Sequence, residues 1–183
     1  MQPIDQDPDG TRLRLQFSYI LCALFYLHSR CMNRPPPDLT ANSRALKWFL
    51  ETALSYLGTP YIWGGDDPSG FDCSGFVVEC LKAAGFLAEG ADSTADGLLH
   101  RFADHTVARP SPGALLFTVN ESGAAFHVAI CLDEHFQISV AGGDRTVTDS
   151  TAAWRANAYI RIRPIRFDPR SMKVINLFDF GKP

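Results

Sequence analysis

Residues 58–86 read GTPYIWGGDDPSGFDCSGFVVECLKAAGF, and this stretch decides the fold. Its second half predicts a helix, because apolar residues recur every three or four positions and Gly85 supplies a stop signal. Its first half is rich in glycine, proline and aspartate, which sustain neither a helix nor a central strand. The backbone therefore turns sharply before Asp72 and places Cys73 in the first helical turn. The apolar positions of the helix are Phe76, Val77, Cys80, Leu81 and Ala84.

Cys73 has the setting of an activated thiol. At a helix start, unpaired N–H groups and the positive end of the helix dipole favour a thiolate over a thiol. Such a cysteine can have its pKa lowered from about 8.5 to roughly 3.5 to 7.5. The alternative is a buried small hydrophobe, as many free cysteines are, but a core cysteine does not need the preceding loop of glycines and acids. Cys80 lies within the apolar stripe and is expected to belong to the core.

Three motifs in this order resemble the NlpC-type cell-wall peptidases, small papain-like cysteine enzymes of bacteria that cut the stem peptides of peptidoglycan. The motifs are PYIWGG from Pro60, DCSGF from Asp72 and HVAICL from His127. The resemblance extends over residues 43–164. It implies a papain-like fold in which Cys73 is the nucleophile and His127 the base. The side chains expected to line the substrate cleft are Tyr61, Trp63, Asp72 and Ser74.

His127 begins a predicted strand, where a lone histidine is commonly a bystander. A cysteine peptidase, however, needs an imidazole beside the thiol to take its proton and later protonate the leaving amine. A third residue should accept a hydrogen bond from the imidazole and fix its tautomer. In the resembled family this residue falls at Ser139, and Gln137 on the same face is the alternative. If the hairpin turns through residues 132–134, His127 and Ser139 lie opposite each other.

The remaining pattern predicts an α+β domain with helices, one of them carrying Cys73, packed on an antiparallel sheet. Two further helices are expected, the second opened by a capping box at Ser93. Five strands are expected after them. The predicted helices span residues 43–57 and 93–102, and the predicted strands span residues 114–119, 126–132, 136–140, 145–148 and 158–165.

The amino-acid composition limits the classes of function that the chain can have. The 183 residues are 46% hydrophobic, enough for one core and short for two. A formal net charge of −3 and the lack of a basic run argue against nucleic acid as a partner. The five cysteines include no C-x-x-C pair, which fits neither a zinc knuckle nor a full disulfide framework. We expect no metal and no cofactor; the oligomeric state is left open.

The first residues form a segment of their own. Residues 17–27 are uncharged and mostly apolar, too short to span a bilayer but suited to a signal-peptide core, a membrane contact or a docking helix. Arg30 and Arg34 follow the run, which opposes export of what comes next, and Met32 is an alternative start. A triproline at residues 35–37 marks the boundary. The expected domains are residues 1–41, an N-terminal segment, 42–165, the peptidase, and 166–183, a C-terminal arm.

The sequence thus predicts a cysteine endopeptidase whose substrate is a peptidoglycan stem peptide or muropeptide. By resemblance, the bond cut joins γ-D-glutamate to the diamino acid. The alternatives are another amidase, toxin-like hydrolase or acyltransferase of the same clan, and a wall-binding module with little turnover. The expected location is the cell envelope or outside the cell if residues 17–27 are an export signal, and the cytoplasm if they are not.

Overall fold

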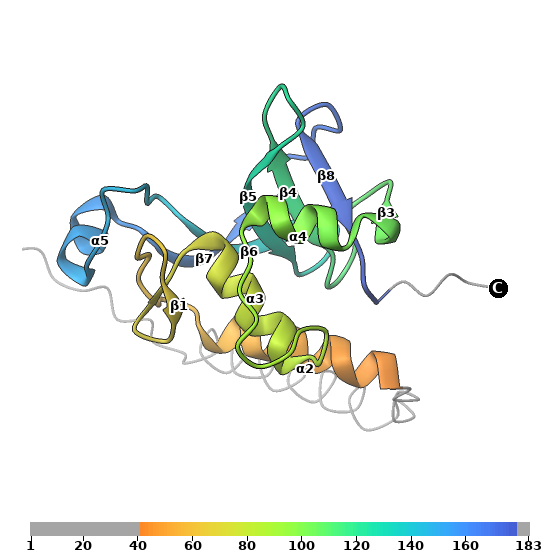
Figure 1. Ribbon diagram of the computed structural model, residues 1–183, viewed down its shortest axis with the longest axis horizontal. Coiled ribbons are helices and arrows are strands. Elements are labelled where there is room, and N and C mark those ends of the chain that lie inside the picture. Colours follow the sequence, from red (N-terminus) through yellow and green to blue (C-terminus); the bar gives the residue numbers. More distant parts are fainter. Residues whose placement is uncertain (1–40, 179–183) are drawn as a thin grey trace, which may run out of the picture. The chain divides into compact units, whose positions relative to one another are not determined.

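The computed structural model describes residues 41–178 (Figure 1). The chain divides into two units, Met1–Leu39 and Thr40–Pro183, and the whole first unit lies outside the described residues. The predictions for the apolar run at residues 17–27 and for the triproline boundary lie outside them as well. Within the described part of the chain, no helix is both long and apolar enough to cross a membrane.

Three helices precede most of the main sheet. They are α2 (Ala41–Ser55), α3 (Cys73–Ala83) and α4 (Ala95–Arg101). The prediction that the central helix starts at Cys73 is confirmed. The cap of α4 differs from the expected one: Thr94 is the N-cap and accepts from the N–H of Gly97, 3.1 Å away. A two-stranded ribbon of β1 (Asp66–Asp67) and β2 (Gly70–Phe71) lies between α2 and α3.

The main sheet has six strands in the order β3-β8-β4-β5-β6-β7, and every neighbouring pair is antiparallel. This confirms the predicted α+β class. A short 3₁₀ turn, η1 (Ala103–His105), leads into the first strand. The strands are β3 (Thr106–Val107), β4 (Leu115–Val119), β5 (Ala125–Cys131), β6 (Phe136–Ala141), β7 (Tyr159–Pro164) and β8 (Met172–Ile175).

The principal core lies between the helices and one face of the sheet. Alternate sheet residues such as Phe117 and Ile130 pack there against Phe49 of α2, Phe76 of α3 and Leu98 of α4, all fully buried. Figure 1 shows α4 lying across β4 and β5, the strands at the middle of the sheet. The other face carries a smaller cluster: Ala114, Leu116, Ala129, Cys131 and Val174.

Two segments differ from the predicted pattern. The strand expected at residues 145–148 is a loop, because Asp144 accepts from both the backbone N–H and the hydroxyl of Thr146 and closes a turn. The helix α5 (Ser150–Ala156) follows it and was not expected. Its N-cap is Asp149, and Asn157 ends it in the left-handed conformation at φ 53°.

The tail expected as an extra strand or an arm contributes a strand to the sheet. Residues of β8 pair with β3 on one side and β4 on the other. The main sheet therefore extends at least to Ile175.

Candidate active site

The glycine-rich loop delivers Cys73 to the first residue of α3, as its composition predicts. Asp72 is the N-cap. Its Oδ1 atom accepts from the N–H of Gly75 at 2.8 Å and from the N–H and hydroxyl of Ser74, each at 2.9 Å. Its Oδ2 atom accepts from the N–H of Gly64 at 3.2 Å. The carboxylate thus ties the loop to the helix on both sides of the cysteine, and the Ser74 hydroxyl is part of the same cap.

Gly75 allows the loop to lie directly on the helix. A Cβ atom at this position would collide with the carbonyl oxygen of Gly65 and would meet the Cα of Asp66 at 3.1 Å. The same Gly65 carbonyl accepts from the N–H of Asp72 at 2.9 Å. The close approach of loop and helix therefore fixes the position of the thiol.

The thiol of Cys73 faces strand β5. Pairing between β5 and β6 is confined to Ile130 with Ile138 and Cys131 with Gln137, at the hairpin end. Beyond these pairs the backbone N–H of Val128 is directed at the Cys73 sulfur. The Cys73 thiol therefore lies against the residue that follows His127.

The electrostatics of Cys73 differ from the expected lowering of the pKa. Burial raises the pKa of the thiol above its ordinary value, and the negative charge of Asp72 raises it further. The backbone N–H groups of Val128, Ser74 and Cys73 itself act in the opposite direction but do not outweigh burial. The position at the helix start alone predicts a lowered pKa for Cys73. Desolvation of the thiol in the folded protein raises that pKa instead.

His127 lies on β5 opposite Thr118 of β4, next to a β-bulge. Phe126 is the extra residue of the bulge and is exposed. Bulges commonly re-aim side chains beside active sites. Burial lowers the pKa of His127 below its ordinary value, and the positive charge of Arg163 lowers it further. No other described residue hydrogen-bonds to the ring, which leaves its nitrogens open to a proton from Cys73 or from a substrate.

The raised pKa of Cys73 and the lowered pKa of His127 both favour the uncharged forms, a thiol and an imidazole. Neither group is among the causes of the other's shift, and no hydrogen bond joins these two described side chains. A neutral imidazole can accept a proton, which is what a general base beside a thiol requires.

Tyr61 lies close enough to Cys73 for the charge of that residue to act on its hydroxyl. Its ring is buried, and burial raises the pKa of its hydroxyl, with further contributions from the charges of Cys73, Asp72 and Asp144. The hydroxyl therefore stays protonated at neutral pH and can donate a hydrogen bond. Within residues 41–178 it has no hydrogen-bond partner, so it is available to a ligand.

The loop after β6 was not expected at the site. Gly143 packs against the Tyr61 ring so closely that a Cβ atom would overlap it. The carbonyl of Val147 accepts from the N–H of Trp63 at 2.8 Å. No local pattern predicts this contact, because it joins segments about 80 residues apart and depends on the path of β6.

The strand register around the third candidate catalytic residue, Ser139 or Gln137, differs from the expected one. The two pairs of β5 with β6, Ile130 with Ile138 and Cys131 with Gln137, are offset by two residues from the register that would place His127 opposite Ser139, and the pairing ends before His127. The hairpin turn is longer than residues 132–134, since the N–H of Leu132 bonds to the carbonyl of Phe136. Ser139 is buried and Gln137 is half-buried, and neither hydrogen-bonds to His127.

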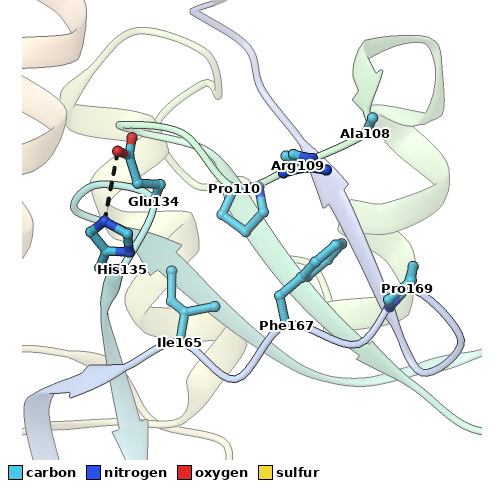
Figure 2. A pocket seen from close by; sticks show the side chains of 8 residues that line it. All are labelled: Ala108, Arg109, Pro110, Glu134, His135, Ile165, Phe167 and Pro169. Carbon is cyan, nitrogen blue, oxygen red and sulfur yellow. Dashed lines mark ion pairs between the residues drawn. The ribbon is translucent and has the colours of Figure 1, made fainter.

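A large hollow lies away from the thiol. It has a volume of about 810 Å³. Figure 2 shows Glu134 and His135, at the turn between β5 and β6, on one side of it and the segment around Phe167 below it. None of the predicted site residues lines it. Its lining is Ala108, Arg109, Pro110, Glu134, His135, Ile165, Phe167 and Pro169.

Within residues 41–178, no group of three or more His, Cys, Asp or Glu side chains is placed to hold a metal ion. The chemistry of the described site is that of a thiol, an imidazole and a phenol. A helix that starts with a cysteine and packs on an antiparallel sheet carrying a histidine defines the papain-like class of cysteine peptidase.

The chain belongs to the NlpC/P60 family, whose model matches residues 58–163. It is 30% identical over 123 residues to dipeptidyl-peptidase 6 of Lysinibacillus sphaericus, covering 67% of this chain and 42% of the relative. It is 49% identical over 37 residues to a γ-D-glutamyl-L-lysine dipeptidyl-peptidase of Bacillus subtilis. This match covers 20% of this chain and 12% of the relative. The matched segments span less than half of either relative's length.

Among solved structures, the chain is similar to the NlpC/P60 domain of the peptidoglycan hydrolase SagA, with a TM-score of 0.52 and 25% identity. The alignment covers 72% of this chain and 98% of that domain. The likeness therefore extends over the whole of a single peptidase domain.

Proposed function

We propose that this protein is a cysteine endopeptidase that hydrolyses an amide bond in peptidoglycan stem peptides. The observation that carries the proposal is the placement of the Cys73 thiol against β5 next to His127, with the Tyr61 hydroxyl beside it. The finer proposal is that the bond joins γ-D-glutamate to the diamino acid. It is supported by the similarity to a relative named for γ-D-glutamyl-L-lysine, which covers only a fifth of this chain.

In the proposed first step, the imidazole of His127 takes the proton of the Cys73 thiol as the sulfur attacks the scissile carbonyl carbon. The C–S bond forms, and the carbonyl π electrons move to oxygen. The N–H of Cys73 is one of the unpaired donors of the helix start, and it and the Tyr61 hydroxyl stabilise the oxyanion. Protonated His127 then donates to the leaving amine, the C–N bond breaks, and an acyl-enzyme remains.

In the second step, His127 takes a proton from water, which attacks the thioester carbonyl. The C–S bond breaks, the peptide carboxylate is released and the thiol regains a proton. Each step moves one proton onto the imidazole and then off it again, so a ring that is neutral at rest suits the cycle. Ser139 or Gln137 would orient that ring.

The proposal is tested with defined muropeptides and mass spectrometry of the products. Cleavage at γ-D-glutamate yields a fragment ending in that residue and a fragment starting with the diamino acid. Products of other masses would refute the proposed bond while leaving a peptidase, and intact muropeptides after long incubation would refute the proposed activity.

We propose a location in the cell envelope or outside the cell, since that is where peptidoglycan lies. A fusion of residues 1–40 to a reporter that is active only outside the cytoplasm tests this. A reporter signal is expected; a silent fusion, together with full activity of a protein started at Met32, would contradict it.

A further inference from the structure

The loop over residues 142–147 forms a wall beside the active-site loop. Gly143 lies against the ring of Tyr61, and the Val147 carbonyl bonds to the N–H of Trp63. Asp144 is close enough for its charge to raise the Tyr61 pKa. This wall therefore borders the place where a substrate must lie to reach Cys73.

Arg145 is held on this wall by an aromatic ring. Its guanidinium carbon lies 6.0 Å from the centre of the Trp63 ring, and the tryptophan is 53% exposed. Stacking on an aromatic face orients a guanidinium while leaving its N–H edges free. Trp63 thus presents Arg145 to solvent at the margin of the site.

The guanidinium of Arg145 makes no hydrogen bond or ion pair with any other described residue. Its neighbour Asp144 accepts from the N–H of Thr146 at 2.8 Å and from its hydroxyl at 2.6 Å, and the charge of Arg145 helps to lower the pKa of Asp144 without an ion pair between them. The donors of Arg145 are therefore available to a ligand.

The surroundings of Arg145 are otherwise acidic. Residues 61–74 and 142–147 include four aspartates, and Arg145 is the only cation in these two segments. Within these two segments Arg145 alone can offset the negative charge met by an anionic group, while the charge of Arg163 acts at His127. The residues concerned are Asp66, Asp67, Asp72 and Asp144.

We infer that Arg145 binds a carboxylate of the substrate next to the scissile bond and makes the enzyme selective for stem peptides in which this carboxylate is free. The inference rests on the proposed function. A γ-linked glutamyl residue keeps its α-carboxylate, separated from the scissile carbonyl by a short methylene chain. The planar guanidinium fork matches a carboxylate in two hydrogen bonds, and amidation of the carboxylate removes both its charge and one acceptor.

The test uses two muropeptides that differ only in this group, free carboxylate or amide, and measures kcat/KM on each. The wild type should prefer the free carboxylate by about 10- to 100-fold, the range for a hydrogen bond to a charged group. Arg145→Gln should lose this preference, because kcat/KM should fall on the muropeptide with the free carboxylate and stay unchanged on the amidated one. Arg145→Lys should keep part of it, because the charge remains and the fork does not.

The matched control is Arg101→Gln. Arg101 also stacks on an aromatic ring, 5.8 Å from the centre of Phe102, and it is not among the charges that act on Cys73 or Tyr61. This variant should keep the wild-type preference. If Arg145→Gln lowers kcat/KM equally on both muropeptides, the role of Arg145 is structural and the inference is overturned. No change in kcat/KM on either muropeptide would also overturn it.

If the wild type cleaves neither muropeptide, the proposed function fails, and binding then decides the inference. Calorimetry on Cys73→Ala should give tighter binding of the free carboxylate, and this difference should vanish in Cys73→Ala with Arg145→Gln. Equal binding of the two muropeptides to Cys73→Ala would overturn the inference.

Discussion

Asp72 caps the helix that begins with Cys73, and the same carboxylate raises the pKa of the Cys73 thiol. One side chain therefore has two opposed effects on the nucleophile. As a cap it fixes the position of the thiol, and as a charge it disfavours the thiolate. Asp72 acts through Cys73 as a positioning residue, and the two effects can be separated by substitution.

Asp72→Asn should keep the helix cap through its amide oxygen and remove the charge, since asparagine is an equally good N-cap; its amide nitrogen no longer accepts from the N–H of Gly64. A negative charge nearby disfavours a thiolate, so its removal should lower the pKa of Cys73. The measurement is the pH profile of Cys73 alkylation by iodoacetamide, followed by peptide mapping. Cys80 and Cys131 are fully buried and should react slowly throughout.

Asp66→Asn is the control for this experiment, because Asp66 lies in the same loop and is not among the causes of the Cys73 shift. Its profile should match the wild type. An Asp72→Asn profile that also matches the wild type would contradict the assigned electrostatic effect. Asp72→Ala should in addition lose about 1 kcal/mol of stability, the usual value of an N-cap.

Arg163→Gln should move the acid limb of the kcat/KM profile to higher pH. The charge of Arg163 helps to lower the pKa of His127, so its removal raises that pKa towards the ordinary value. Activity needs a neutral imidazole, and it is therefore lost at a higher pH as the solution is acidified. Arg166→Gln is the control and should leave the limb in place. An acid limb that stays in place or moves to lower pH in Arg163→Gln would refute the assigned effect of Arg163 on the His127 pKa.

The residue that orients His127 is predicted to be Ser139 and not Gln137. In the observed register Ser139 lies nearer to His127 along the strand, and Gln137 pairs with Cys131 at the far end. Ser139→Ala should lower kcat with little change in KM, because imidazole orientation is lost and substrate binding is not. Gln137→Ala should be close to wild type. A large loss in Gln137→Ala alone would reverse the assignment, and full activity in both variants would mean that Cys73 and His127 act as a dyad.

Gly75→Ala should destabilise the protein. In an ordinary helix position this change is stabilising by up to about 1 kcal/mol, but here the added Cβ meets the Gly65 carbonyl. Crowding of this kind costs about 1 to 3 kcal/mol. Urea unfolding measures the sign directly, and a Gly75→Ala protein as stable as the wild type would show that the loop does not need this close contact.

Local pattern was enough to predict the elements that carry the nucleophile. The turn before Asp72 and the period of the apolar residues up to Ala84 both depend on neighbours in sequence. The strands β4 to β7 were predicted within a few residues for the same reason. The signals for α5 were also local, an N-cap at Asp149 and a left-handed Asn157, but the threonines at positions 146 and 148 favoured a strand.

Local sequence pattern could not predict the features that depend on long-range contacts. The register of β5 and β6 depends on the turn at residues 132–135, and a shift of two residues moves Ser139 away from His127. The raised pKa of Cys73 follows from burial, which only the packed domain creates. The contact of Gly143 with Tyr61 joins distant segments.

The measurement that tests the central claim most directly compares the wild type with Cys73→Ala on defined muropeptides, with product analysis by mass spectrometry. The wild type is predicted to cut the γ-D-glutamyl bond. Cys73→Ala is predicted to be inactive while remaining folded, because the change removes a single sulfur atom from a partly buried side chain at the edge of the core. Cleavage by Cys73→Ala at the wild-type rate would contradict the claim that this thiol is the nucleophile.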